Sequence, residues 1–407
     1  MNKAYRVRLY PTQEQEVLIN KTFGCVRLVW NTLLDKNIKG FENEGKSWKQ
    51  DYNTTKLKDS FEFLNEVSAA SLQQKARDLK ETYSQWFRSV TGKRKIKIGY
   101  PKFKSKKFSK DSYRLPNQKF SIYQDLNLIR LEKIGKVKCK LSDTIPEDVK
   151  FISVTVSKTK SNKYYASVVV EQEKKFLPLT GKKIGIDLGS KDLMTLSNGV
   201  IIKRSNYLRE SQSKIKKSQQ HLSRKSKGSS RYEKQRIKLA KLQEKVANKR
   251  EWFTHNITKA IIKNYDVICV ETLSSKDMQS FSSINKVLSE VSLYEIVRQL
   301  EYKADWYGKT FTKVDKWFPS SQLCSVCGHR NIETKDLSPR PGPPTGRCAP
   351  TSYRTRGQSP SAQPEREPCL ARTAVVPNWH HRLLRRLRSS GTGWPPGGGR
   401  RLRRAGS

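Results

Sequence analysis

The sequence predicts a mixed α/β protein of two or three domains, and three observations lead to this fold class. The chain has 407 residues, enough to bury a sizeable core. Short strands of alternating apolar residues occur on both sides of a long helical block. After residue 182 a second series of strands and helices begins, and two of its strands carry an acid, Asp187 and Glu271. We therefore expect a small β-barrel interrupted by helices, followed by a separate α/β domain.

The composition points to a polyanionic partner. The chain has 82 Lys and Arg against 37 Asp and Glu, a formal net charge of +45, which favours nucleic acid. A membrane surface is disfavoured, because the sequence has neither a spanning apolar segment nor a signal peptide. We therefore expect a cytoplasmic, nucleoid-associated protein of prokaryotic type. Seven cysteines in such a chain favour thiols and metal ligation over disulfides.

The N-terminal part is expected to combine the barrel with a helical domain. Residues 1–12 form an amphipathic strand, and Thr12 opens a helix that starts a helical domain over residues 13–92. A second helix is predicted over 60–90, so the block is interpreted either as a helix-turn-helix or as a plain helical bundle. The barrel then continues over residues 93–178, with strands near 120–122, 128–131, 137–141, 152–156 and 164–170.

A strongly basic segment, residues 93–110, connects the helical domain to these strands. It interleaves basic and aromatic residues without an acid, a pattern that suits a phosphate backbone; the alternative is a solvated loop. The lysines predicted to contact nucleic acid are Lys102, Lys104, Lys106 and Lys107. Tyr100, Phe103 and Phe108 are expected to stack or pack.

Residues 182–318 are expected to form a nuclease-like domain. The order of three strands, a basic helical region, a strand, a helix and a strand matches an RNase H-like fold, in which acids on adjacent strands hold metal. Asp187 is expected in the middle of a buried sheet with Glu271 on a neighbouring strand. Such a pair could share Mg²⁺ ions, which two-metal nucleases hold about 3.5–4 Å apart. The string around Asp187 also resembles the first phosphate loop of actin-like ATPases, which is the alternative.

The C-terminal region contains an incomplete metal site and an abrupt change of composition. Cys324 and Cys327, followed by Gly328, form half of a zinc knuckle within residues 319–338; a redox pair is the alternative. No second CxxC follows. Residues 339–407 contain 14 Arg but no Lys, no Asp, no Ile and no Phe, and 11 of the 17 Pro. We expect this tail to be disordered and to result from a frameshift or fusion.

These residues together resemble the transposon-encoded TnpB proteins, RNA-guided nucleases related to type V CRISPR effectors. The motifs are VRLYPTQEQ, YPKFK, IGIDLGSKD, VANKREWFTH, YDVICVETL, RQLEYKADWYGK and FPSSQLCSVCG. The resemblance implies a wedge β-barrel with an inserted recognition domain, a RuvC nuclease domain and a zinc module. It also implies a guide RNA, a double-stranded DNA target and Mg²⁺. Asp187 and Glu271 match the first two catalytic acids, and Gln73 matches a position facing the short DNA motif beside the target.

The chain departs from the family pattern after Ser338. Such proteins continue into a second CxxC and an HDRD-type segment that provides a third catalytic Asp, whereas no Asp follows Asp336 here. We therefore expect impaired cleavage with some nucleic-acid binding retained. The alternatives are a nuclease-dead RNA- and DNA-binding protein or a decayed transposase.

Overall fold

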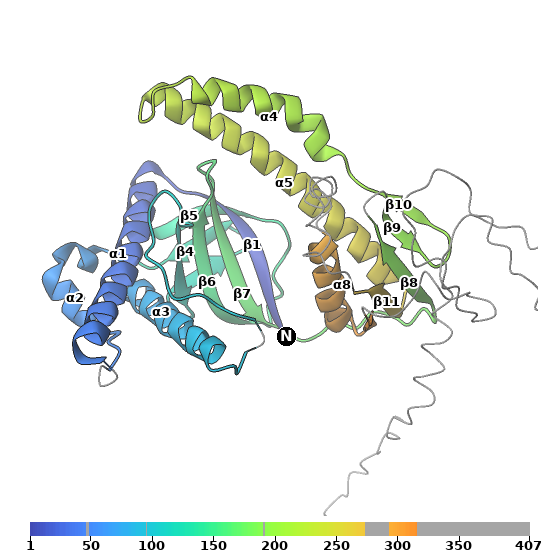
Figure 1. Ribbon diagram of the computed structural model, residues 1–407, viewed down its shortest axis with the longest axis horizontal. Helices are drawn as coiled ribbons and strands as arrows, with labels where there is room; N and C mark the ends of the chain where they lie inside the picture. Colours follow the sequence, from blue (N-terminus) through green and yellow to red (C-terminus); the bar gives the residue numbers. More distant parts are fainter. Residues whose placement is uncertain (46–48, 95, 190–191, 273–292, 316–407) are drawn as a thin grey trace, which may run out of the picture. The chain divides into compact units, whose positions relative to one another are not determined.

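The computed structural model describes residues 1–45, 49–94, 96–189, 192–272 and 293–315, and these fall into two compact units (Figure 1). The first unit contains residues 1–174 and 211–248, and the second contains residues 175–210 and the described residues from 249 onward. Both units combine helices with strands, which confirms the predicted mixed α/β class. The half zinc knuckle and the compositionally distinct tail lie outside the described residues.

The first unit is built on a curled, seven-stranded antiparallel sheet in the order β2-β6-β7-β1-β5-β4-β3. Its strands are β1 (Asn2–Tyr10), β2 (Ser112–Pro116), β3 (Phe120–Tyr123), β4 (Leu128–Leu131), β5 (Gly135–Leu141), β6 (Lys150–Lys158) and β7 (Tyr164–Glu171). Among the described residues β2 and β3 are edges, so the sheet curls like half a barrel without closing. Strand β2 was not predicted from the sequence pattern; it is a short strand that ends at Pro116 on the edge of the sheet, where a residue without an N–H is tolerated.

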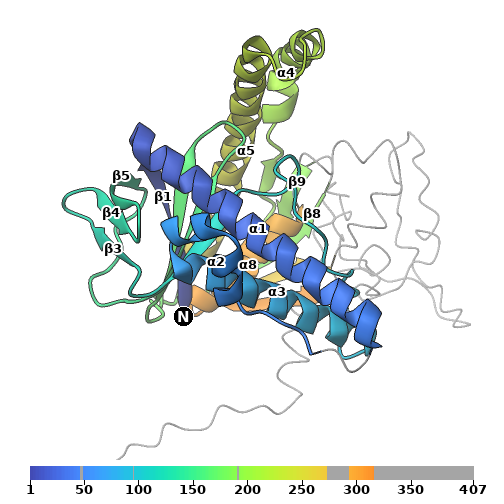
Figure 2. The ribbon, with the colours of Figure 1, turned by 90° about the vertical axis from the view of Figure 1, so that its left-hand side faces the viewer.

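The N-terminal helices of the first unit pack beside one another and, in part, against β2 (Figure 2). They are α1 (Gln13–Glu44), α2 (Thr55–Ser60), a 3₁₀ turn (Glu62–Glu66) and α3 (Ala69–Val90). Helix α1 starts with the expected cap: the Thr12 hydroxyl accepts from the Gln15 N–H, and the Gln15 side chain accepts from the Thr12 N–H. It then runs unbroken for 32 residues. The helix predicted over 60–90 starts only at Ala69, because the 3₁₀ turn and the extended residue Val67 precede it.

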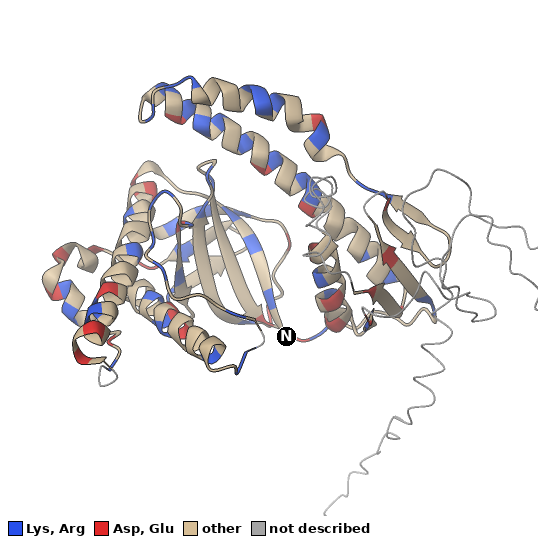
Figure 3. Cartoon of the chain, in the orientation of Figure 1, with Lys and Arg blue, Asp and Glu red and all other residues tan. Residues whose placement is uncertain are grey.

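Two long basic helices, α4 (Tyr207–Ser223) and α5 (Ser230–Asn264), carry Lys and Arg along their length (Figure 3). Within the first unit, the Glu244 carboxylate of α5 accepts from the Ser161 hydroxyl and pairs with the Lys163 ammonium, both at 2.8 Å. Arg236 donates to the carbonyl oxygen of Lys160. The connection between β6 and β7 is thus fixed to α5 by three contacts.

The second unit contains a mixed five-stranded sheet in the order β10-β9-β8-β11-β12. The elements are β8 (Lys183–Leu188), β9 (Asp192–Leu196), β10 (Ile201–Lys203), β11 (Val267–Glu271), α8 (Leu293–Tyr307) and β12 (Thr310–Val314). Strand β11 is parallel to both β8 and β12, whereas β8, β9 and β10 pair antiparallel. One core joins Ile186 and Val270 of the sheet to Ile261 of α5 and Leu300 of α8. The opposite face of the sheet carries a small apolar cluster of Val267, Cys269 and Val314, together with the acidic residues Asp187 and Glu271.

Candidate functional site

Asp187 and Glu271 lie side by side on the two central parallel strands of the second unit. Ile186 of β8 is in register with Val270 of β11, so the acids that follow are level with each other. Ile186 and Val270 face the apolar core. Because strand side chains alternate between faces, the two acids share the opposite face. The structure thus brings the predicted pair together.

The predicted burial of Asp187 is wrong. Its strand is the middle one of the sheet, as expected, but the Asp187 side chain is exposed and Glu271 is half-buried. The reason is the alternation itself: the apolar positions of β8 contact α5 and α8, and Asp187 points to the opposite face. The pair is therefore accessible from solvent.

The electrostatics of the pair fit a cation. The pKa of Glu271 is raised by its burial, by the negative charge of Asp187, and by a hydrogen bond between the two carboxyl groups. Two carboxylates that are close enough to share a hydrogen bond repel each other unless a proton or a cation lies between them. Carboxylate oxygens are the ligands that hard divalent ions prefer. Among the described residues, no third His, Cys, Asp or Glu joins them.

A partly buried ion pair fixes the other end of these strands. Lys309, whose side chain is fully buried, lies with its ammonium 2.6 Å from a carboxylate oxygen of Asp266. Asp266 also accepts from the backbone N–H groups of Thr180 and Gly181. Burial opposes the charge of Asp266, but the hydrogen bond from Lys309 and those from the backbone lower its pKa overall. These contacts join the starts of β8, β11 and β12, and so hold the register that pairs the acids.

A buried polar cluster joins α5 to α8 behind the sheet. The Lys303 ammonium donates to the Thr258 hydroxyl, to the Gln299 side-chain oxygen and to the carbonyl oxygen of His255. Burial and the nearby Lys259 charge lower the pKa of Lys303 to about 8. The cluster therefore positions the helices that support the acidic strands.

The basic segment of the first unit forms a strap, residues 96–110, across α1. The Trp30 indole donates to the carbonyl oxygen of Lys102 at 3.0 Å. Asn31 exchanges two hydrogen bonds with the backbone of Lys104, at 2.8 and 2.9 Å. The strap thus has a defined path, which the alternative of a solvated loop did not anticipate.

The predicted nucleic-acid contacts on this strap differ in exposure. Lys102, Lys106 and Lys107 are exposed, whereas Lys104 is half-buried with its ammonium 3.2 Å from the centre of the Trp30 ring. The aromatic residues of the strap also differ in exposure. Phe108 is 83% exposed and Phe103 is 56% exposed, whereas Tyr100 packs edge-on against Tyr83 and Trp86.

Gln73 lies on α3 with an exposed side chain, free to meet a ligand from solvent. Lys75, two residues further on, lines a cavity together with Lys104 and Arg27 of α1. Sequence reasoning missed Lys75 and Arg27. Each is a basic residue at the border of an apolar helical stripe: Arg27 follows the buried Val26, and Lys75 precedes the buried Ala76. This was the signal available in the sequence.

The proposed zinc ligands, Cys324 and Cys327, lie outside the described residues. The cysteines within the described part of the chain, Cys25, Cys139 and Cys269, are buried free thiols. Burial raises the pKa of all three.

Comparisons with known families match three regions of the chain. Residues 167–281 match a family described as a probable transposase, of the IS605 OrfB type, and residues 1–46 match its helix-turn-helix domain. Residues 294–352 match the TNB domain of Cas12f1-like proteins. In this structure the helix-turn-helix region contributes β1 and the single helix α1.

Relatives extend the similarity over most of the chain. A protein of Streptomyces pristinaespiralis named "Putative RNA-guided DNA endonuclease" is 30% identical over 333 residues, covering 81% of either chain. The protein InsQ of Escherichia coli K12, with the same description, is 29% identical and covers 82% of this chain and 85% of its own.

One solved structure, the complex of Cas12f1 with single guide RNA and target DNA, aligns with 82% of this chain and 94% of its own. The TM-score is 0.45 and the sequence identity 13%.

Among the described residues, no helix has the length and apolar character needed to cross a membrane.

Proposed function

The chain belongs to the TnpB family of transposon-encoded proteins, and on this premise we propose that it is an RNA-guided DNA-binding protein with a divalent-cation site at Asp187 and Glu271. The observation that carries the proposal is the pairing of these two acids on β8 and β11, on the accessible face of the sheet. The order of elements around them is the one expected of an RNase H-like, RuvC-type domain.

The proposed partners are a guide RNA and a double-stranded DNA target. In RNA-guided recognition, base pairing reads the sequence and the protein reads a short flanking motif and the backbone. The net charge of +45 and the exposed strap lysines supply the backbone contacts. Gln73, exposed on α3, is the candidate for the flanking motif.

Asp187 and Glu271 would hold Mg²⁺ through their carboxylate oxygens. When bound, such an ion lowers the pKa of a coordinated water and stabilises charge on the phosphate oxygens. The protein's part is to keep the two carboxylates level, which the register of β8 and β11 and the Asp266–Lys309 pair achieve. Solvent access to Asp187 gives a phosphodiester a route to the pair.

Cleavage by this chain is proposed to be weak. No Asp follows Asp336, and Glu365 and Glu367 lie among prolines. Two acids alone position two ions poorly. A zinc site at Cys324 and Cys327 lacks its second CxxC for the same reason, the change of sequence after Ser338.

A nuclease-dead binder or a decayed transposase is the second candidate, and it shares the binding surfaces. The actin-like ATPase alternative finds no support in the matched families. A two-part experiment separates the candidates. The chain is assembled with a guide RNA, and binding and Mg²⁺-dependent cutting of a matched DNA duplex are measured.

We expect guide-dependent binding and little cutting. Replacing residues 339–407 by the family's C-terminal segment, with its second CxxC and HDRD-type string, should restore cutting, and Asp187→Asn should abolish it again. Strong cutting by the unmodified chain would refute the proposed impairment. Absence of guide-dependent binding would refute the function itself.

A further inference from the structure

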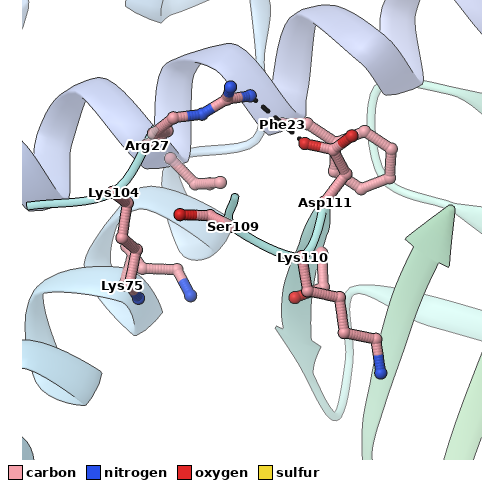
Figure 4. Close-up of a pocket in the computed structure, with 9 residues that line it drawn as sticks. Phe23, Arg27, Lys75, Lys104, Ser109, Lys110 and Asp111 are labelled. Atoms are coloured by element: carbon pink, nitrogen blue, oxygen red, sulfur yellow. Dashed lines mark hydrogen bonds and ion pairs between the residues drawn. The ribbon is translucent and has the colours of Figure 1, made fainter. Parts of the chain in front are cut away.

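The first unit contains a cavity of about 280 Å³ between α1, α3 and the strap (Figure 4). Its lining includes Phe23 and Arg27 of α1, Lys75 of α3, and Lys104, Ser109 and Asp111 from the strap and the start of β2. This volume holds several waters but is slightly below that of a site for a drug-sized ligand. A small charged group fits it better than a whole nucleotide.

The charges around the cavity are unevenly compensated. The Arg27 guanidinium lies 3.3 Å from the Asp111 carboxylate, and the Lys75 ammonium lies 3.1 Å from that of Asp78. Within the described part of the chain, Lys104 forms no ion pair. Its side chain ends beside that of Lys75, as Figure 4 shows. The cavity is lined by four basic residues, of which Lys110 is exposed. Arg27 and Lys75 pair with carboxylates, whereas the ammonium of Lys104 lies over the Trp30 ring and has no carboxylate partner among the described residues. The positive charge of Lys104 is therefore not compensated by an anion.

The uncompensated charge is energetically unfavourable where it lies. Burial, and then the neighbouring Lys75 charge, lower the pKa of Lys104 to about 8. The hydrogen bonds between Asn31 and the Lys104 backbone prevent the residue from moving out with the strap. An anion in the cavity would offset this cost. The Ser109 hydroxyl at the rim offers a neutral donor for the same anion.

We propose that this cavity binds one phosphate group of a nucleic-acid backbone, with Lys104 as its principal cation and Lys75 and Ser109 as supporting donors. The assignment rests on the proposed nucleic-acid function for the source of the phosphate, but the pocket itself does not. The other strap lysines would contact further phosphates from the surface, where no cavity fixes them. Lys104 would thus set the register of the backbone along α1 and α3.

Inorganic phosphate is the first probe, because it tests the pocket without nucleic acid. The full chain is melted in sodium phosphate and in sodium chloride at matched ionic strength. We expect phosphate to raise the melting temperature of the wild type and of Lys106→Met, an exposed strap lysine outside the cavity. Lys104→Met should lose this increase, and Lys104→Arg should keep most of it. If phosphate stabilised Lys104→Met as much as the wild type, or did not stabilise the wild type, phosphate binding through Lys104 would be contradicted.

A duplex DNA and a single-stranded RNA then identify the source of the phosphate. Loss of one backbone contact should lower the log–log salt slope of binding by about 0.9 for duplex DNA or about 0.7 for a single strand. The nucleic acid whose slope falls in Lys104→Met, and is recovered in Lys104→Arg, is the ligand. If neither slope falls, the backbone assignment is wrong even where phosphate binds. A chain that lacks guide-dependent binding but is still stabilised by phosphate would refute the proposed function and would still support phosphate binding in the cavity.

Discussion

Glu271 and Asp187 are an electrostatically unfavourable pair of acids that also forms the candidate cation site. Their carboxyl groups share one face of the sheet, and burial together with the Asp187 charge raises the pKa of Glu271. Nothing in the packing of the strands requires acids there, since the core lies on the other face. The two neighbouring like charges are therefore consistent with the proposed cation site.

Glu271→Gln should stabilise the protein in the absence of divalent ions. Removing one of two neighbouring like charges on adjacent strands should raise the free energy of unfolding by roughly 0.2–1 kcal/mol. The lower end is expected, because Asp187 is exposed and water screens it. Urea denaturation in EDTA measures the change, and a destabilised variant would contradict the repulsion.

Lys303 gives a pH dependence of known sign. Its folded-state pKa of about 8 lies below the ordinary 10.5, so burying the charge destabilises the fold fully below pH 8. This cost disappears as the pH rises from about 8 to 10.5. The stability of the wild type should therefore rise relative to Lys303→Met over this range. Thermal melts of both proteins against pH test it; a constant difference would show that Lys303 titrates normally.

At the scale of elements, the long periodic segments were predictable and the local breaks were not. The helix predicted to open at Thr12 and the strand predicted over 128–131 both form as expected. The delayed start of α3 depends on Val67 and Leu64, which pack into the core and stop the helix. That packing is tertiary, so a single sequence does not contain it.

The end of α8 offers a matched pair of glycine substitutions. Gly308 has a φ of +69°, and a Cβ there would overlap the exposed ring of Phe176. Gly308→Ala should cost about 1–2 kcal/mol in backbone strain, because its φ lies in the left-handed region. Gly24 lies within α1 with open space around it, so Gly24→Ala should instead stabilise by about 1 kcal/mol. Chemical denaturation of both variants checks the opposite signs; a neutral Gly308→Ala would contradict the strained turn.

For the whole molecule, the sequence predicted the acidic pair and the basic character, but not the cavity beside Lys104. Asp187 and Glu271 could be identified from the strand patterns, because each lies near the end of an apolar run. Arg27, Lys75 and Lys104 come from three segments that only the folded unit brings together. The exposure of Asp187 was also missed, since a strand pattern does not say which face a helix covers.

Nucleic-acid binding by the whole chain should depend steeply on salt and be independent of the acids. With each neutralised phosphate contributing about 0.9 to the log–log slope on duplex DNA, several contacts give a slope well above one. Asp187→Ala should leave both the affinity and the slope unchanged when divalent ions are absent. Fluorescence anisotropy across a salt series measures both; a flat response would exclude the basic surfaces as backbone contacts.

The most direct test is calorimetric titration of Mg²⁺ into the full chain and into Asp187→Asn, Glu271→Gln and Asp192→Asn. The last variant makes the same charge change on the neighbouring strand β9, outside the pair. Saturable binding by the wild type and by Asp192→Asn, with loss in the other two, is the expected result. Binding that survives in Asp187→Asn and Glu271→Gln would contradict a cation site at the two acids.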